Sequence, residues 1–306
     1  MNPLDCRMDD TFLSDAWIRQ TDGLACLGPY LDITLAAAAR VRENSVLRDY
    51  TVSLAAAMRD RESFMTTLKT LEFPRPEAGE PPLAYDFIPL LALLTQLASS
   101  VERMRARYIP EKVIDASLGN TAECLRVFQR RYLRPGMDMH YFAWSQGFID
   151  ARILRIGSLE FEACPRFGQP FVLPDRVILP DDPVISVHIP AGADISDAGR
   201  HAAYGEARTI FRACFPEYAF RGFACWSWLM DPQLCAMLPN SKIAAFQGEF
   251  IRLPNRWGGD AVFEYVFPAP FSSLDDLPEN TTLERRVKTH YLDGKKIDEM
   301  CGIIPF

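Results

Sequence analysis

The chain has 306 residues, of which 48% are hydrophobic and 24% charged, as in a folded globular protein and unlike a disordered one. Its net charge is −7, shared evenly: residues 1–151 hold 17 Lys/Arg and 20 Asp/Glu, and residues 152–306 hold 16 and 20. Because the sequence shows no basic face, we expect neither nucleic acid nor an anionic membrane surface as a partner.

The cysteines, the N-terminus and the apolar runs argue against disulfide-bonded, metal-binding, secreted and membrane-spanning classes of protein. Eight cysteines form no CxxC pair and no Cys/His cluster at metal-ligand spacing, so we expect reduced thiols and no metal site. The N-terminal MNPLDCRMDD lacks the basic flank and apolar segment of a secretory signal. The longest apolar run, Ile88–Leu94, is too short to span a bilayer. These features predict a cytoplasmic protein without a membrane segment.

The first half is predicted to be helical. Apolar residues recur at three- and four-residue spacing over three ranges: Leu31–Arg42, Ser45–Arg61 and Ser63–Leu71. The proline-rich loop Phe73–Pro82 ends this block. Asp86 as N-cap, with Pro89 in the first turn, predicts a helix that runs to about Arg107. A helix opened by Pro110 and one over Met139–Ile153 complete this half.

Around Gly157 the apolar period changes from 3.6 to 2, and Leu159–Ala163 alternates as a strand does. Further strands are predicted at Val184–Ile189, Arg221–Cys225, Lys242–Leu253 and Ala261–Phe267. Helices are predicted at Ser196–Cys214, Leu234–Leu238 and Leu283–Leu292. A β-α-β unit set among antiparallel hairpins gives a mixed sheet. We therefore predict an α+β protein with a helical domain at 1–151 and a mixed-sheet domain at 152–306.

One stretch, Val184–Pro239, indicates where a ligand would bind. It is predicted to be a strand, a Gly-bearing turn, a helix and a second strand that stops at Cys225-Trp226-Ser227-Trp228. In α/β units, ligands lie where the carboxyl ends of strands meet helix N-termini, because unpaired backbone N–H groups there favour anions. The sequence therefore predicts a ligand crevice at this edge of the sheet.

Several segments along the chain resemble one bacterial family, the acyltransferase domain-containing proteins with an N-acyltransferase N-terminal domain and a GNAT-like C-terminal domain. They are RIGSLEFE (155–162), VHIPAG (187–192), FPEY (215–218), FACWSWL (223–229), DPQL (231–234) and IAAFQ (243–247). The resemblance implies a helical domain followed by a GNAT-like mixed sheet. It also implies transfer of an acyl group from an acyl-CoA, such as acetyl-CoA, to an amine of a small molecule.

The segment after the strand that ends at Ile189 departs from ordinary GNAT enzymes. Those carry Arg/Gln-x-x-Gly-x-Gly/Ala, whose backbone N–H groups surround the cofactor diphosphate. Here the spacing around Gly192 differs, and Asp194 and Asp197 bring negative charge. Asp197 fits a first-turn residue that favours the helix dipole. The expected cofactor-binding residues are Ile189, Ala191, Gly192, Ala193, Asp194, Ile195 and, as a floor, Trp226.

Acyl transfer to an amine needs a base and a proton donor. His188, at the end of its strand, is one candidate base; the alternative is a histidine hydrogen-bonded within the sheet edge. Glu160 is the other candidate base, sharing one strand face with Glu162; the alternative is a solvated outer face. Ser227 and Tyr265, the latter on a predicted strand, are the candidate acids. Ser227 has the alternative of capping the helix after Pro232.

Other residues of this stretch have two interpretations. Cys225 is either a nucleophile or a small core residue. Trp226 and Trp228 form either a pocket floor or core. The arginines that flank the crevice bind either phosphate or surface carboxylates: Arg221, Arg252 and Arg256.

Three functions stay open at this point. The first is an acyl-CoA-dependent N-acyltransferase. The second is a non-catalytic ligand-binding or regulatory module that keeps the GNAT shape without a working cofactor loop. A splayed gap between the two parallel strands favours the enzyme, and a closed pair plugged by tryptophan favours the module. The third, a helical interaction domain with an attached structural sheet, requires a large exposed apolar patch on residues 31–71.

Overall fold

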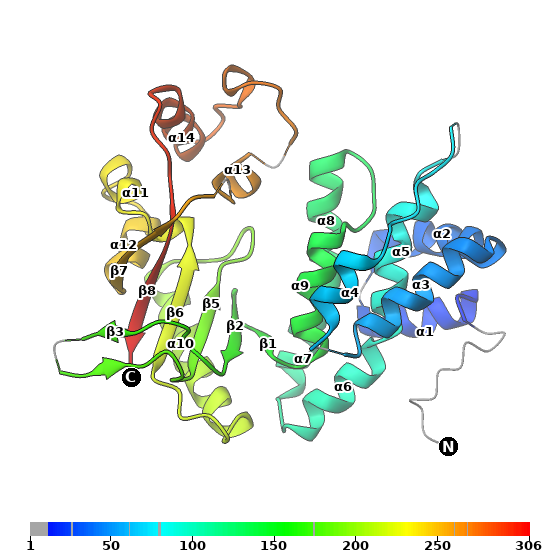
Figure 1. The fold of residues 1–306 in the computed structure, drawn as a ribbon, viewed down its shortest axis with the longest axis horizontal. Helices are drawn as coiled ribbons and strands as arrows, with labels where there is room; N and C mark the ends of the chain where they lie inside the picture. Colours follow the sequence, from blue (N-terminus) through cyan, green and yellow to red (C-terminus); the bar gives the residue numbers. More distant parts are fainter. Residues whose placement is uncertain are drawn as a thin grey trace. The chain divides into compact units, whose positions relative to one another are not determined.

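The computed structural model describes residues 12–25, 27–60, 62–78, 81–173, 175–259, 261–267 and 269–306. The chain divides into two compact units, Met1–Arg152 and Ile153–Phe306. The first is helical and the second contains the sheet (Figure 1). An α+β architecture with a helical first half is confirmed.

The first unit contains nine described helices, and the spacing of apolar residues predicts most of them. They are α1 Asp15–Ala25, α2 Leu31–Glu43, α3 Ser45–Ala57, α4 Phe64–Thr70, α5 Leu83–Leu94, α6 Leu97–Ala106, α7 Glu111–Leu118, α8 Asn120–Tyr132 and α9 Met139–Ile149, with a 3-10 turn η1 at Gly28–Tyr30. Helix α1 is not among the predicted helices. Within the described part of residues 31–71, the exposed large hydrophobic side chains are Val46 and Met65. The two lie on different helices, which gives no support to an interaction patch there.

Helix α5 is the apolar centre of this unit, with every side chain from Phe87 to Leu94 buried. The predicted N-cap role of Asp86 is wrong. The helix begins at Leu83, and the Asp86 carboxylate instead accepts hydrogen bonds from Arg134 at 2.6 and 3.2 Å. The segment Leu83–Ala106 is long and apolar enough to cross a membrane, although 78% of its apolar window is buried inside the structure, as in a core helix.

The second unit is built on a six-stranded mixed sheet in the order β1-β2-β5-β6-β8-β7. Its strands are β1 Ile153–Ile156, β2 Leu159–Cys164, β5 Val184–His188, β6 Gly222–Ser227, β7 Ile251–Trp257 and β8 Glu299–Pro305. The hairpin β3 Phe171–Val172 and β4 Val177–Ile178 forms a separate two-stranded sheet. Strands β5 and β6 are parallel and the other described pairs are antiparallel, so the predicted mixed sheet is confirmed.

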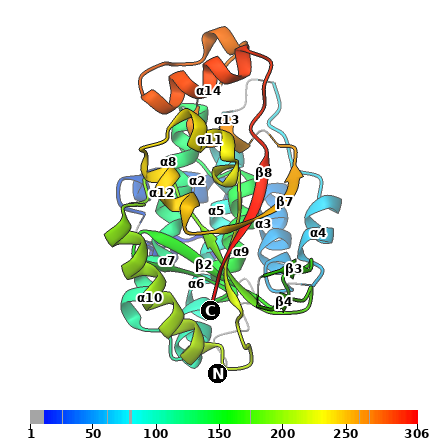
Figure 2. The ribbon, with the colours of Figure 1, turned by 90° about the vertical axis from the view of Figure 1, so that its left-hand side faces the viewer.

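Helix α10, Asp197–Cys214, connects β5 to β6 and lies along one face of the sheet (Figure 2). On that face Phe161 of β2 contacts Tyr204 and Phe211 of α10 edge to face. The other face packs Ala224 of β6 against a second cluster that includes Phe167. The central strands β5 and β6 therefore have two covered faces, which explains why they are buried along most of their length.

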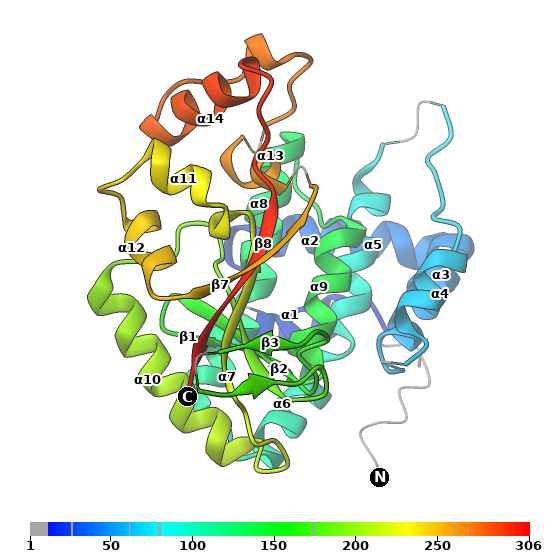
Figure 3. The same cartoon turned by 60° about the vertical axis from the view of Figure 1, so that its left-hand side comes forward.

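Two predicted strands are wrong. Lys242–Leu253 is helix α12, Lys242–Gly248, followed by β7, because the Ser241 side chain caps the helix by accepting from the Ala244 N–H at 3.1 Å. Ala261–Phe267 is helix α13, Ala261–Val266. Strand β8, which is not among the predicted strands, lies beside β7 (Figure 3) and takes the place between β6 and β7 in the sheet (Figure 1). Short apolar runs fit either a strand or a buried helix, which is the source of both errors.

The remaining elements of this unit are short. They are the 3-10 turns η2 Trp228–Met230 and η3 Leu274–Asp276, and helices α11 Pro232–Met237 and α14 Thr282–Leu292. Helix α14 begins with a capping box, in which Thr281 and Glu284 each bond the other's backbone N–H. The predicted helices at Leu234–Leu238 and Leu283–Leu292 are thus confirmed within a few residues.

Candidate active site

The parallel strands β5 and β6 separate at their carboxyl ends. Their ladder holds the pairs Ile185–Phe223 and Ser186–Ala224. Beyond it, β5 continues alongside β2 as far as His188, and β6 continues alongside β8 as far as Ser227. Each strand therefore keeps its outer partner and leaves the inner one, which opens the sheet between them. This is the splayed arrangement that the enzyme hypothesis requires.

The turn that follows β5 leads directly into α10. Gly192 has φ +78°, a left-handed conformation that other residues rarely adopt. The Ala193 N–H donates to Pro190 O at 3.1 Å, and the Ser196 side chain caps the helix by accepting from Gly199 N–H at 3.3 Å. The N–H groups of Asp197 and Ala198, in the first helical turn, have no intrahelical acceptor, so this end of the helix favours an anion.

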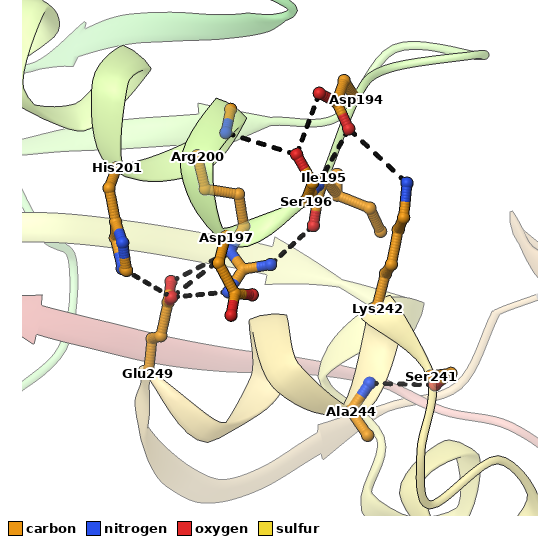
Figure 4. Close-up of polar contacts among 11 residues, drawn as sticks. Asp194, Ile195, Ser196, Asp197, Arg200, His201, Ser241, Lys242, Ala244 and Glu249 are labelled. Carbon is orange, nitrogen blue, oxygen red and sulfur yellow. Dashed lines mark hydrogen bonds and ion pairs between the residues drawn. The ribbon is translucent and has the colours of Figure 1, made fainter.

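The two aspartates of this turn already have partners. The Asp194 carboxylate accepts from the Ser196 N–H at 3.0 Å and from its hydroxyl at 2.9 Å, and lies 3.6 Å from Lys242 Nζ (Figure 4). The backbone bond from Ser196 is the largest cause that lowers the pKa of Asp194. Asp197, in the first turn as expected, accepts from Arg200 at 2.8 Å. Their charges are therefore balanced locally.

Three polar side chains gather on the face of β2 and β5 opposite α10. Glu160 and Glu162 leave the same face, as predicted, and Glu160 lies beside His188 in the register of the two strands. His188 Nε2 lies 3.0 Å from Glu162 Oε2, and Arg155 Nη2 donates to Glu160 Oε1 at 2.9 Å. Glu160 is 3% exposed and Glu162 is mostly buried, so the solvated outer face is wrong.

Ser227 ends β6 and caps the turn that follows. Its hydroxyl oxygen accepts from the Leu229 N–H at 3.1 Å, which begins η2. The predicted cap on the helix after Pro232 is wrong, because Asp231 supplies it by accepting from the Gln233 N–H at 2.9 Å. Since the Ser227 hydroxyl acts as an acceptor in its own bond, it retains its proton for donation.

Tyr265 lies on α13 and not on a strand. Its ring is stacked near that of Trp228, with centroids 6.5 Å apart. Tyr265 is 48% exposed, yet partial desolvation by the surrounding protein, and after it the charges of Glu264, Glu160 and Glu299, raises its pKa to about 12. Its hydroxyl therefore stays protonated at neutral pH and lies within electrostatic reach of Glu160.

Trp226, the predicted floor, is partly buried and packs against Phe167, with ring centroids 5.4 Å apart. It stands on the sheet face opposite α10, as Ala224 does. The flanking arginines pair with protein groups: Arg221 with Asp182, Arg252 with Gln247, and Arg256 with Asp298. The predicted pairing with surface carboxylates is thus found for Arg221 and Arg256, whereas Arg252 donates to the buried Gln247 amide oxygen.

Cys225 is a core residue and not a nucleophile. It is fully buried, and this burial raises the pKa of its thiol to about 12, so almost no thiolate forms at neutral pH. We expect a thiol reagent at pH 8 to leave Cys225 unmodified in the folded protein and to modify it in denaturant, as measured by peptide mass spectrometry. Cys164, which is only partly buried, is the internal comparison, because it should be modified more than Cys225 in the folded protein. Equal modification of both thiols before unfolding would contradict this assignment.

Sequence reasoning missed two important residues, Arg200 and Glu249. They are 49 positions apart, yet the Arg200 guanidinium donates to the Glu249 carboxylate at 2.6 Å. No local sequence pattern indicates such a pair. The pair is recognised from the structure, because Arg200 is buried within a helix. Among the described residues, no group of three His, Cys, Asp or Glu side chains could hold a metal ion.

Comparison with known proteins defines the class. Residues 153–304 match the GNAT-like C-terminal domain family, and a helical region precedes them. The second half of the chain is thus a GNAT-like C-terminal domain.

Solved acyltransferase structures share the fold along most of the chain. One, in complex with decanoyl-CoA and teicoplanin, is 22% identical, with a TM-score of 0.73 over 94% of this chain and 87% of that one. Another, in complex with decanoyl-CoA, is 24% identical, with a TM-score of 0.72 over 96% and 88%. A third, bound to CoA and 10C-teicoplanin, is 21% identical, with a TM-score of 0.73 over 94% and 87%. No curated protein matches the sequence.

Proposed function

We propose that this protein is an acyl-CoA-dependent N-acyltransferase that acts on an amine of a small molecule. The observation that carries the proposal is the opening between β5 and β6, where the ladder stops at Ser186 and Ala224. Acyltransferases of the same fold have been solved with decanoyl-CoA bound, which supports an acyl-CoA as the ligand of this chain.

The residues at the opening fit an acyl-CoA. The left-handed turn at Gly192 lets backbone approach a phosphate closely, and the first turn of α10 presents N–H groups and a positive dipole end. The residues from Ile189 to Ile195 would hold the diphosphate, and the separated ends of β5 and β6 would take the extended thiol arm. The bound thioester supplies the electrophilic carbonyl for the reaction.

His188 and Glu162 form the base in this proposal. A protonated amine must lose a proton before its lone pair can attack the carbonyl. With Nε2–H donated to Glu162, the lone pair of the His188 imidazole is on Nδ1, and the carboxylate stabilises the cation that forms when Nδ1 takes the proton. Glu160, buried on the same face, attracts the ammonium group to this position.

Ser227 and Tyr265 are the proposed proton donors to the departing thiolate. Both hydroxyls are protonated at neutral pH, and Ser227 lies at the end of β6, where this strand leaves β5. The new bond joins nitrogen to the acyl carbon, the carbon–sulfur bond breaks, and the thiolate takes a proton from the donor. As the amide forms, the nitrogen loses its second proton, which restores the donor hydroxyl, and the proton held by His188 passes to solvent, so protons and charge balance.

The alternative of a non-catalytic module is supported by the unusual spacing after β5 and by Asp194 and Asp197. Two observations weigh against it. Both aspartates are engaged with Ser196, Lys242 or Arg200, and the strands do not stay paired to their ends.

Isothermal titration tests the proposal directly. We expect the full chain to bind CoA, acetyl-CoA and longer acyl-CoAs, with dissociation constants in the micromolar range, about −8 kcal/mol at 1 μM. Replacing Gly192 with valine should weaken binding, because a β-branched residue is strained at φ +78°. Gly205→Ala, on the exposed side of α10, is the control. Failure of the unmodified chain to bind every one of these ligands at high micromolar concentration would overturn the proposal.

A further inference from the structure

The turn Gly192–Ser196 is held in place by side chains from three other parts of its unit. The Ser158 hydroxyl, between β1 and β2, donates to Asp194 O at 2.8 Å. Lys242, at the start of α12, pairs with the Asp194 carboxylate at 3.6 Å. Arg200, one turn into α10, donates to Ile195 O at 2.5 Å. The carbonyls of two consecutive peptide groups, Asp194–Ile195 and Ile195–Ser196, are therefore bonded, which fixes how the N–H groups of these peptides point.

Arg200 forms the most extensive of these contacts. It is 1% exposed, and an arginine is almost never this buried unless its charge is paired. Its guanidinium donates to three groups: Nη1 to Ile195 O, Nη2 to the Asp197 carboxylate at 2.8 Å, and Nη2 and Nε to the Glu249 carboxylate at 2.6 and 3.2 Å (Figure 4). The planar fork of arginine suits such a multiple contact, which lysine cannot reproduce.

Glu249 is the anchor for Arg200. It follows the end of α12, and its carboxylate also lies 2.9 Å from His201 Nε2. The buried Tyr204 hydroxyl has no hydrogen-bond partner within 3.5 Å, and the Glu249 charge is the second cause, after burial, that raises the pKa of Tyr204. One carboxylate therefore holds the first turn of α10 through Arg200 and His201. Removing it would release Arg200 and with it Ile195 O.

We propose that Arg200, held by Glu249, is a positioning residue that shapes the Gly192–Ser196 turn and thereby sets the affinity for the CoA diphosphate. This inference rests on the proposed function. Arg200 is buried behind the turn and its donors are used by protein acceptors, so it acts through the backbone N–H groups and touches neither the acyl group nor the amine. Loss of the fork should weaken CoA binding and leave the chemical step intact.

The test compares Arg200→Gln, Arg200→Lys and Glu249→Gln, with Arg212→Gln, an exposed position of the same helix, as the matched control. We expect Arg200→Gln to raise the Kd for CoA and the KM for acyl-CoA by about tenfold or more, equivalent to about 1.4 kcal/mol. The kcat should change far less. The Kd and KM of Arg200→Lys should lie between those of the unmodified chain and those of Arg200→Gln, because lysine keeps the charge but lacks the planar guanidinium fork. Arg212→Gln should behave as the unmodified chain.

Amide hydrogen exchange of peptides that cover residues 192–200 provides a readout independent of CoA. We expect faster exchange there in Arg200→Gln and Glu249→Gln and not in Arg212→Gln. If the unmodified chain binds no CoA while exchange behaves as expected, the proposed function fails and the anchoring role stands. Unchanged exchange together with unchanged CoA affinity in either variant would overturn the positioning role. If Arg200→Gln does not fold, the CoA affinity and amide exchange of Glu249→Gln alone test the positioning role.

Discussion

Replacing His188 with glutamine should lower kcat for acyl transfer at neutral pH by about 10²–10⁴-fold, the usual contribution of a positioned general base. Glutamine can still bond Glu162 but cannot accept a proton from an ammonium group. The KM for acyl-CoA should change little, since the imidazole lies on β5 beside Glu160 and Glu162, where the amine is proposed to bind. Steady-state kinetics with an acyl-CoA and an amine acceptor measure both constants.

Two variants separate the chemical role of His188 from general damage. His140→Gln removes an exposed histidine of α9 and should leave kcat unchanged. Glu162→Gln retains the hydrogen bond to the imidazole but loses the charge, and should lower kcat less than His188→Gln does. A His188→Gln protein with normal CoA affinity and normal kcat would assign the base to Glu160 or to water.

The local patterns of the sequence were sufficient for the parts of the site that lie on regular elements. Period-2 alternation at Leu159–Ala163 correctly placed Glu160 and Glu162 on one face, and the helix after Ser196 implied the parallel β5–β6 pair. The register that brings His188 beside Glu160 depends on strand pairing, which alternation alone does not specify.

The rest of the site depends on contacts between distant segments. Arg200 meets Glu249 across 49 positions, and Tyr265, from a segment predicted to be a strand, lies within the electrostatic influence of Glu160. The apolar run in Ile243–Phe246 fits both the helical period of 3.6 residues and the strand period of 2. The segment is a helix because Ser241 caps it and because β8 takes the position beside β6 in the sheet. The sequence therefore indicated the opening of the sheet and missed the groups that brace it.

Replacing Asp231 with alanine should destabilise the second unit by about 3 kcal/mol or more. The Asp231 carboxylate is fully buried and accepts from the Gln233 N–H at 2.9 Å, the Gln233 side chain at 3.0 Å and the Asp298 N–H at 2.8 Å. Alanine would remove the cap of α11 and leave the Asp298 N–H, which precedes β8, without its acceptor. The DPQL segment that resembles the acyltransferase family is thus explained as a structural link between η2, α11 and β8.

Urea denaturation followed by tryptophan fluorescence measures this loss, because Trp228 is in η2, three residues from Asp231. Asp181→Ala is the matched control: that carboxylate is exposed, and its pair with Arg166 at 3.4 Å should contribute within about 0.5 kcal/mol. Since β8 is the partner along which β6 continues after its ladder with β5 stops, CoA affinity should fall together with stability in Asp231→Ala. A variant with unchanged stability would show that the buried carboxylate is dispensable for this link.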